Sequence, residues 1–315
     1  MEQAEGMEQP KQQSESMNDP LTYAPSPGNQ AATGLSPQVG GGLCSCGGNP
    51  NGAGMTAYSY VYALGSVEPR FPRLAVEKEL AQARGRLETA GLTDRQALHT
   101  VLRQNRYLAR QMCYVLTIEG LETYILQPRD PADFDLLVEA IRPSDDPRDV
   151  KIDLVIGVRG PIAPPELCNG LMVPIVMFDQ IYSFTKGLLL QEIQKHRPQE
   201  IEERPFAQTV SELFDRGILQ MADNAGATDE HRALNYLAVR YPAIYVTAAE
   251  RHAQNASLTA VDVRPSRLSG VRRIVDVIFS YTHRQTDVTE KYFVRVDVTE
   301  EFPFLVTRLS PYYDR

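Results

Sequence analysis

Tryptophan is absent from this 315-residue sequence, and cysteine occurs only four times. No uninterrupted apolar run approaches the roughly 18 residues that a membrane-spanning helix needs, so we expect no membrane partner. The N-terminus is rich in Glu and Gln and lacks the basic start and apolar core of a secretory signal. Together these absences predict a cytoplasmic protein.

An excess of positive charge is also missing, because the formal net charge is −8 at pH 7. A nonspecific nucleic-acid binder needs a basic face that releases the counterions of the phosphate backbone. The composition therefore argues against a nucleic-acid partner and leaves room only for a local basic groove.

The four cysteines are Cys44, Cys46, Cys113 and Cys168. In a reducing cytoplasm, thiols and metal ligands are more common than structural disulfides. Glycines flank the Cys44-Ser-Cys46 motif and let the backbone wrap closely around a bound ion. Four thiolates suffice for a closed tetrahedral zinc site, so one hypothesis is a structural zinc. The alternative is two free thiols in a tail and two buried core cysteines.

Composition divides the chain in two. Residues 1–55 are dominated by Gln, Glu, Ser, Pro and Gly, with too few large apolar side chains to offset the entropy of ordering, so they are predicted to be a disordered tail. Residues 56–315 are predicted to form a single domain. It begins with a strand from Tyr58 that Gly65 is expected to end, followed by a proline-rich elbow that carries Glu68 and Arg70 and by an amphipathic helix.

Local signals indicate further elements downstream. Thr93 and Gln96 have the spacing of a capping box that starts a helix. Two alternating apolar runs between residues 113 and 126 flank a Glu-Gly pair and predict a hairpin. A strand is predicted over residues 150–158. Another is predicted over 173–179, confined by Pro174 to a sheet edge or to the first residues of the strand, with a helix directly after Asp179.

The last third of the sequence changes to a period of two. Alternating runs over residues 256–263, 273–281 and 291–298, and a shorter one from Phe304, predict an antiparallel meander. The overall class is therefore α+β, with antiparallel sheets (an N-terminal strand plus hairpin, and a C-terminal meander) packed with several helices. Three Val-Asp-Val motifs lie in these runs. They favour a polar sheet face over a valine core more strongly than a metal site.

Arginines cluster between the first helix and the hairpin, at Arg95, Arg103, Arg106 and Arg110. One interpretation is a basic groove for an acidic peptide or a carboxylate. The other, which the surrounding acidic residues favour, is a solvated face with ion pairs.

Signatures of catalysis are missing. No pair of the five histidines has the helical spacing of a zinc hydrolase, and no Ser nucleophile elbow or phosphate-binding loop occurs. Catalysis would then depend on residues that only the fold brings together, with Cys168 or a histidine as the candidate group.

The segments at residues 60–72, 92–99, 105–111 and 117–130 resemble the C-terminal domain of PatG-type cyanobactin maturation proteases, and the resemblance runs from about Cys44 to near the C-terminus. That domain is described as one of unknown function. It accompanies a subtilisin-like macrocyclase in the assembly of ribosomally made, modified cyclic peptides. The protease domain has no counterpart in this sequence.

The resemblance implies an accessory, non-catalytic role in which the domain binds a precursor peptide or a processing enzyme. Our candidate contacts are Glu68 and Arg70 in the elbow and Arg103, Arg106 and Arg110 in the arginine cluster, and an exposed meander edge is a candidate for strand addition. The alternatives are a peptide-modifying or peptide-cleaving enzyme and a structural zinc or dimerisation module, which allows a homodimer.

Overall fold

The computed structural model describes residues 59–85, 92–146, 148–214 and 223–313. The predicted tail, with Cys44 and Cys46, lies outside the described residues. Residues Met55–Arg315 form one compact unit, and all that follows concerns this unit. The architecture is α+β, as predicted, with a five-stranded mixed sheet and a four-stranded antiparallel meander.

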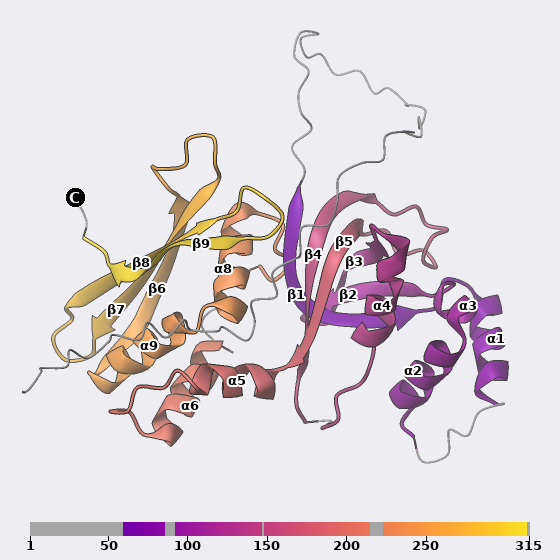
Figure 1. The fold of residues 1–315 in the computed structure, drawn as a ribbon, viewed down its shortest axis with the longest axis horizontal. Coiled ribbons are helices and arrows are strands. Elements are labelled where there is room, and N and C mark those ends of the chain that lie inside the picture. The colour runs from indigo at the N-terminus through magenta and orange to yellow at the C-terminus, as the bar shows by residue number, and fades with distance from the viewer. Residues whose placement is uncertain (1–58, 86–91, 147, 215–222, 314–315) are drawn as a thin grey trace, which may run out of the picture. The chain divides into compact units, whose positions relative to one another are not determined.

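The five-stranded sheet closes into a barrel with the strand order β1-β2-β3-β5-β4 (Figure 1). Every neighbouring pair is antiparallel except β3 and β5, which are parallel. The prediction of purely antiparallel sheets was therefore wrong for this one pair. The strands are β1 (Tyr60–Arg70), β2 (Cys113–Ile118), β3 (Leu121–Pro128), β4 (Lys151–Ile162) and β5 (Pro174–Thr185).

Strand β1 does not end at Gly65, as the sequence suggested, but continues to Arg70. Its first half pairs with β4 and its second half with β2. Gly65 is needed at the crossing because a Cβ there would lie 2.6 Å from the carbonyl oxygen of Thr117. Beside it, the buried Asp153 carboxylate accepts hydrogen bonds from the Val67 amide (2.7 Å) and the Ser183 hydroxyl (2.5 Å). These bonds fasten β1 to β4 and β5.

Strand β5 corrects one further prediction. It belongs to the closed barrel and runs past Asp179 to Thr185 before helix α5 (Lys186–Gln194) begins. Gly157 pairs with Phe178 and Ile156 with Gln180, so Asp179 is the extra residue of a β-bulge. The bulge interrupts the alternation of side chains, which is why the pattern seemed to stop there. Pro174 is the first residue of the strand, one of the two positions allowed for it.

The predicted hairpin and capping box are both present. Glu119 and Gly120 have φ values of 50° and 83°, as a tight two-residue turn between β2 and β3 requires. Thr93 and Gln96 cap helix α2 (Asp94–Gln104) reciprocally. Asp130 accepts a hydrogen bond from the Ala132 amide and starts a short 3-10 helix, which leads into α4 (Phe134–Ala140). Helices α1 (Leu74–Arg84) and α3 (Arg106–Ala109) complete this region.

The C-terminal part pairs helices with the meander, as Figure 1 shows. Its helices are α6 (Glu203–Glu212), α8 (Asp229–Arg240) and α9 (Ala243–Ala253), and the predictions lacked α9. Its strands are β6 (Ala256–Pro265), β7 (Ile274–His283), β8 (Thr289–Asp297) and β9 (Phe304–Pro311), in that order and antiparallel throughout, which confirms the predicted meander.

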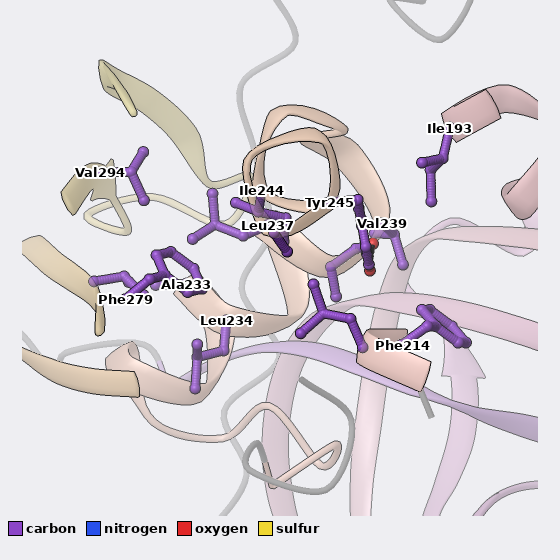
Figure 2. Close-up of a cluster of buried hydrophobic side chains, with 14 of the residues drawn as sticks. Ile193, Phe214, Ala233, Leu234, Leu237, Val239, Ile244, Tyr245, Phe279 and Val294 are labelled. Atoms are coloured by element: carbon purple, nitrogen blue, oxygen red, sulfur yellow. Dashed lines mark hydrogen bonds between the residues drawn. The ribbon is translucent and has the colours of Figure 1, made fainter. Parts of the chain in front are cut away.

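Alternate residues of β1 contribute to two hydrophobic cores. Val61 and Ala63 belong to a cluster with the other barrel strands and helices α1 to α4. Tyr62 and Leu64 belong to a second cluster with α8, α9 and the meander, part of which Figure 2 shows. Since neighbouring side chains of a strand point to opposite faces, β1 is shared between the barrel core and the meander core.

Candidate functional site

A groove opens where β2 and β3 separate. Their ladder ends at the pair Val115 and Ile125. Beyond it, Cys113 and Tyr114 pair with β1, whereas residues 126–128 pair with β5. The two strands therefore diverge within the barrel wall, and a groove of about 620 Å³ lies beside the diverging ends.

The lining of the groove combines apolar and polar surface in similar amounts. Phe134 and Leu137 of the α4 region and Leu167 of the segment between β4 and β5 contribute apolar walls. The Arg110 guanidinium carbon lies 5.9 Å from the centroid of the Phe134 ring, a cation–π arrangement on an exposed arginine. The remaining lining residues are Gln111, Met112, Cys113, Tyr114, Ile125, Leu126, Gln127, Pro128 and Pro131.

Tyr114 fixes the end of β2 against the preceding helical turn. Its hydroxyl donates a hydrogen bond to the carbonyl oxygen of Ala109 (3.0 Å), and its ring meets that of Phe134 edge-on with centroids 5.9 Å apart. Burial raises the pKa of Tyr114, so the phenol stays protonated. Apolar walls with a few polar side chains at the rim suit an extended chain segment that inserts apolar side chains and places an acceptor near Arg110.

The other predicted contact residues do not join Arg110 in the lining of the groove. Arg70 forms an ion pair with Glu122, and Glu68 pairs with Arg95 at 2.7 Å. Arg106 forms an ion pair with Asp135. Arg103 is exposed and lies outside the groove lining. The arginines are thus spread over several exposed ion pairs, the arrangement that the solvated-face interpretation describes.

Cys113 and Cys168 form a disulfide, with Cα atoms 5.9 Å apart. This pairing corrects the expectation of thiols or metal ligands, because a disulfide sulfur is not a thiolate and does not serve as a zinc ligand in that state. Among the residues that the structure describes, no group of three or more His, Cys, Asp or Glu side chains is placed to hold a metal. Zinc binding by Cys44 and Cys46 stays a prediction.

Cys168 is one of the candidate catalytic groups. This residue is fully buried and bonded to Cys113, so it is not presented to a substrate in this state. Burial lowers the pKa of His99, whose Nε2 has no hydrogen-bond partner among the described residues. His231 Nδ1 lies 3.8 Å from a carboxylate oxygen of Asp223.

The Val-Asp-Val motifs form a polar face over a valine core, the favoured interpretation. Val277 and Val296 belong to the core beneath the meander. On the opposite face, Asp276 accepts a hydrogen bond from Arg295 Nε (2.9 Å), and Asp297 forms an ion pair with Arg272. These pairs neutralise the two carboxylates.

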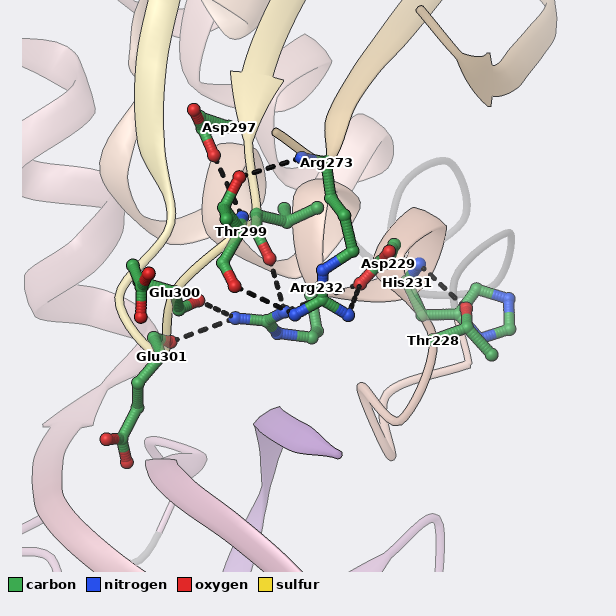
Figure 3. Close-up of polar contacts among 10 residues, drawn as sticks. Thr228, Asp229, His231, Arg232, Arg273, Asp297, Thr299, Glu300 and Glu301 are labelled. Carbon is green, nitrogen blue, oxygen red and sulfur yellow. Dashed lines mark hydrogen bonds and ion pairs between the residues drawn. The ribbon is translucent and has the colours of Figure 1, made fainter. Parts of the chain in front are cut away.

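A second polar cluster surrounds the buried Arg232 of α8 (Figure 3). Its guanidinium donates to the backbone carbonyl oxygens of Val298 (2.8 Å), Glu300 and Glu301 (3.1 Å), and it lies 5.3 Å from the ring centroid of Tyr60. Burial lowers the pKa of Arg232 to about 10, so the side chain stays charged at neutral pH. Arg232 therefore connects α8, the turn after β8 and the first residue of β1.

Glu301, in the same turn, connects the meander to the barrel. Burial, together with a hydrogen bond to the Asp179 carboxyl, raises the pKa of Glu301 to about 8. Arg129 Nη1 lies 2.9 Å from an Asp179 oxygen and 3.6 Å from a Glu301 oxygen. The arginine therefore faces both carboxyl groups and offsets part of the repulsion between them.

Comparison with known proteins agrees with this two-part organisation. Residues 60–163 match the family model of the PatG domain, and residues 200–312 match that of the PatG C-terminal region. A solved structure described as "PatG Domain of Unknown Function" has a similar fold, with a TM-score of 0.66 and 20% sequence identity over 81% of this chain and 99% of that one. No curated protein matches. None of the helices in the described residues is long and apolar enough to cross a membrane.

Proposed function

Because this chain belongs to the PatG domain and PatG C-terminal families, we propose that it is an accessory, non-catalytic domain of a cyanobactin-type pathway that binds a precursor peptide in the groove between β2 and β3. The observation that carries the proposal is the divergence of these two strands beside a groove with apolar walls and polar groups that include Arg110.

Physical reasons support a peptide as the ligand. A linear peptide supplies both the apolar side chains that fill such a groove and the backbone groups that can pair with strands on either side. An extended chain that pairs through its backbone needs an open site with exposed strand groups rather than a closed pocket. A carboxylate of the peptide near Arg110 would gain a charge-assisted hydrogen bond.

The test is fluorescence anisotropy with a fluorescein-labelled precursor peptide of a cyanobactin pathway. We expect saturable binding by the full chain and a roughly tenfold weaker affinity for Phe134→Ala and for Arg110→Glu, a typical loss for contacts at the centre of an interface. Arg103→Glu makes the same charge reversal on an exposed arginine outside the groove and should change the affinity by less than about twofold.

Absence of binding at concentrations of tens of micromolar would overturn the proposal. Equal losses for the Arg110 and Arg103 variants would instead indicate a diffuse electrostatic attraction and would remove the groove as the site.

A further inference from the structure

The disulfide partners lie at the groove itself. Cys113 is the first residue of β2 and lines the groove, and Cys168 belongs to the segment of residues 163–173 between β4 and β5. Leu167, the neighbour of Cys168, also lines the groove. Part of the lining therefore belongs to a segment that is joined covalently to the first residue of β2.

The segment of residues 163–173 has bonds of its own. The Ala163 amide donates to the Val173 carbonyl oxygen (2.9 Å), which closes the base of the segment, and the Gly170 amide donates to that of Pro165 (2.8 Å). A small apolar cluster beneath it contains Cys113, Cys168, Val115, Ile125 and Ala163. The segment thus packs on the barrel through noncovalent contacts that do not require the disulfide.

The geometry also suits the reduced pair. Cys113 Sγ lies 3.3 Å from the carbonyl oxygen of Leu167, so a thiol at this position can donate a hydrogen bond to it. Both cysteines are nearly or fully buried among apolar side chains, where a neutral thiol is well accommodated. Oxidation therefore adds a tether between two surfaces that are already in contact.

We infer that Cys113 and Cys168 form a redox-controlled clasp, which fixes Leu167 at the groove when oxidised and loosens this wall when reduced. The inference rests on the proposed function, because it assigns a regulation to the same groove. Disulfides in reducing compartments are commonly reversible, redox-sensing bonds, which agrees with a clasp that opens.

The reducing partner is a dithiol. One thiolate of the dithiol attacks Cys113 Sγ, which borders the groove, whereas Cys168 is fully buried. The attack forms a mixed disulfide, and Cys168 leaves as a thiolate that takes up a proton. The second thiol of the reductant then displaces Cys113 as a thiol. The protein gains two electrons and two protons, and the dithiol becomes a disulfide.

The oxidised protein should bind peptide more tightly. A wall that is already fixed costs less entropy to order on binding, and ordering one side chain corresponds to roughly a twofold to tenfold change in affinity. We therefore expect about this loss of affinity on reduction.

The test uses the full chain with Cys44→Ser/Cys46→Ser, so that only the clasp can change its redox state. Alkylation with iodoacetamide followed by mass spectrometry reports the thiols, and anisotropy with the labelled precursor peptide reports affinity, before and after treatment with dithiothreitol. We expect two alkylated cysteines and weaker binding only after reduction. Adding Cys113→Ser, which keeps a donor for the Leu167 carbonyl, should give the reduced affinity in both conditions.

The two proposals fail in distinguishable ways. Conversion of the thiols with an unchanged affinity would overturn the clasp and leave the peptide site intact, as would alkylation of both cysteines under oxidising conditions. Absence of peptide binding in both redox states would overturn the proposed function. The rate of proteolysis within residues 163–173 would then decide on the clasp, since a redox-independent rate would overturn it as well.

Discussion

The barrel and the meander differ in where strand pairing is interrupted. The meander has two edge strands, β6 and β9, and each carries at least one β-bulge in its ladder and a proline as its last residue, Pro265 and Pro311. Bulges and prolines are the devices by which sheets discourage the addition of a foreign strand. The barrel has no edge, yet its wall opens between β2 and β3.

The two regions also differ in whether their charged side chains are already paired with opposite charges. On the meander, the carboxylates Asp276 and Asp297 are already paired with Arg295 of β8 and with Arg272 of the connection between β6 and β7. At the barrel opening, Arg110 contacts the aromatic ring of Phe134 in the lining of the groove. A ligand would have to displace internal ion pairs on the meander but not at the groove. The proposed peptide site therefore lies at an interruption inside a closed wall and not at the available edges of the meander.

Arg232 is the residue whose loss should affect this arrangement most, because it holds β1 of the barrel and the turn of the meander to one helix. Arg232→Met removes the donors for three backbone carbonyl oxygens in a buried place. We expect a loss of about 3–5 kcal/mol in the free energy of unfolding, measured by urea denaturation.

Arg273→Met is the matched control, since Arg273 binds Asp229 and the Thr299 carbonyl oxygen in the same cluster but is 40% exposed. Its loss should stay within about 1 kcal/mol. Equal losses for the two variants would mean that the junction depends on charge alone and not on the buried carbonyl contacts.

Loss of the buried Asp153 carboxylate in the barrel should have the next largest effect on the free energy of unfolding. Asp153→Leu leaves the Val67 amide and the Ser183 hydroxyl without their acceptor, which should cost about 2–3 kcal/mol in the free energy of unfolding. Asp276→Leu in the meander releases the partly exposed Arg295 and should cost about 1 kcal/mol. The reverse order would contradict the view that the barrel closure depends on its buried polar contacts.

Several elements of both regions could be predicted from the sequence, because residues close together in the chain specify them. The hairpin from Cys113, the capping box at Thr93 and the meander after Ala256 are specified by turn residues, side-chain–backbone bonds and alternation within a few residues. The closure of the barrel was not predictable in this way. It depends on the parallel pairing of β3 with β5, which lie about 50 residues apart, and on a bulge at Asp179 that breaks the alternation.

The groove was missed for the same reason. Arg110 and Cys113 were singled out from composition and spacing, but the groove arises where the β2–β3 ladder ends while β2 stays paired with β1 and β3 with β5. No local pattern encodes the point at which that ladder ends. The disulfide also depends on the fold, because 55 residues separate Cys113 from Cys168. A local signal that could have indicated the groove is Phe134, an apolar residue between Asp133 and Asp135 at the start of a helix. Phe134 lines the groove.

The pH dependence of stability tests the contact between barrel and meander at Glu301. Its pKa is raised to about 8 in the folded chain, so between its ordinary value and about 8 the folded state binds a proton that the unfolded state has lost. Stability should therefore fall as the pH rises through this window, by about 1–2 kcal/mol once the solvent that reaches the group is taken into account.

Glu301→Gln mimics the protonated form and should flatten this part of the profile, as measured by denaturation at pH 5, 6, 7 and 8 at about constant ionic strength. Glu300→Gln, its neighbour in the same turn, is the control and should keep the wild-type slope. A wild-type profile without any slope in this window would contradict the raised pKa of Glu301.

Peptide affinity, measured for one variant in the groove and one on the meander, compares the two regions most directly. If the groove is the site, Phe134→Ala should weaken binding about tenfold, equivalent to about 1.4 kcal/mol, whereas Val306→Lys on β9 should leave it within about twofold. Val306 is 37% exposed and lies in the bulged part of the β9 ladder, so a lysine is tolerated there and would block the approach of another strand. Anisotropy with the labelled precursor peptide measures both variants. The opposite result would place the peptide on the meander edge, and the bulges of that edge would then be part of the recognition of the added strand rather than a defence against it.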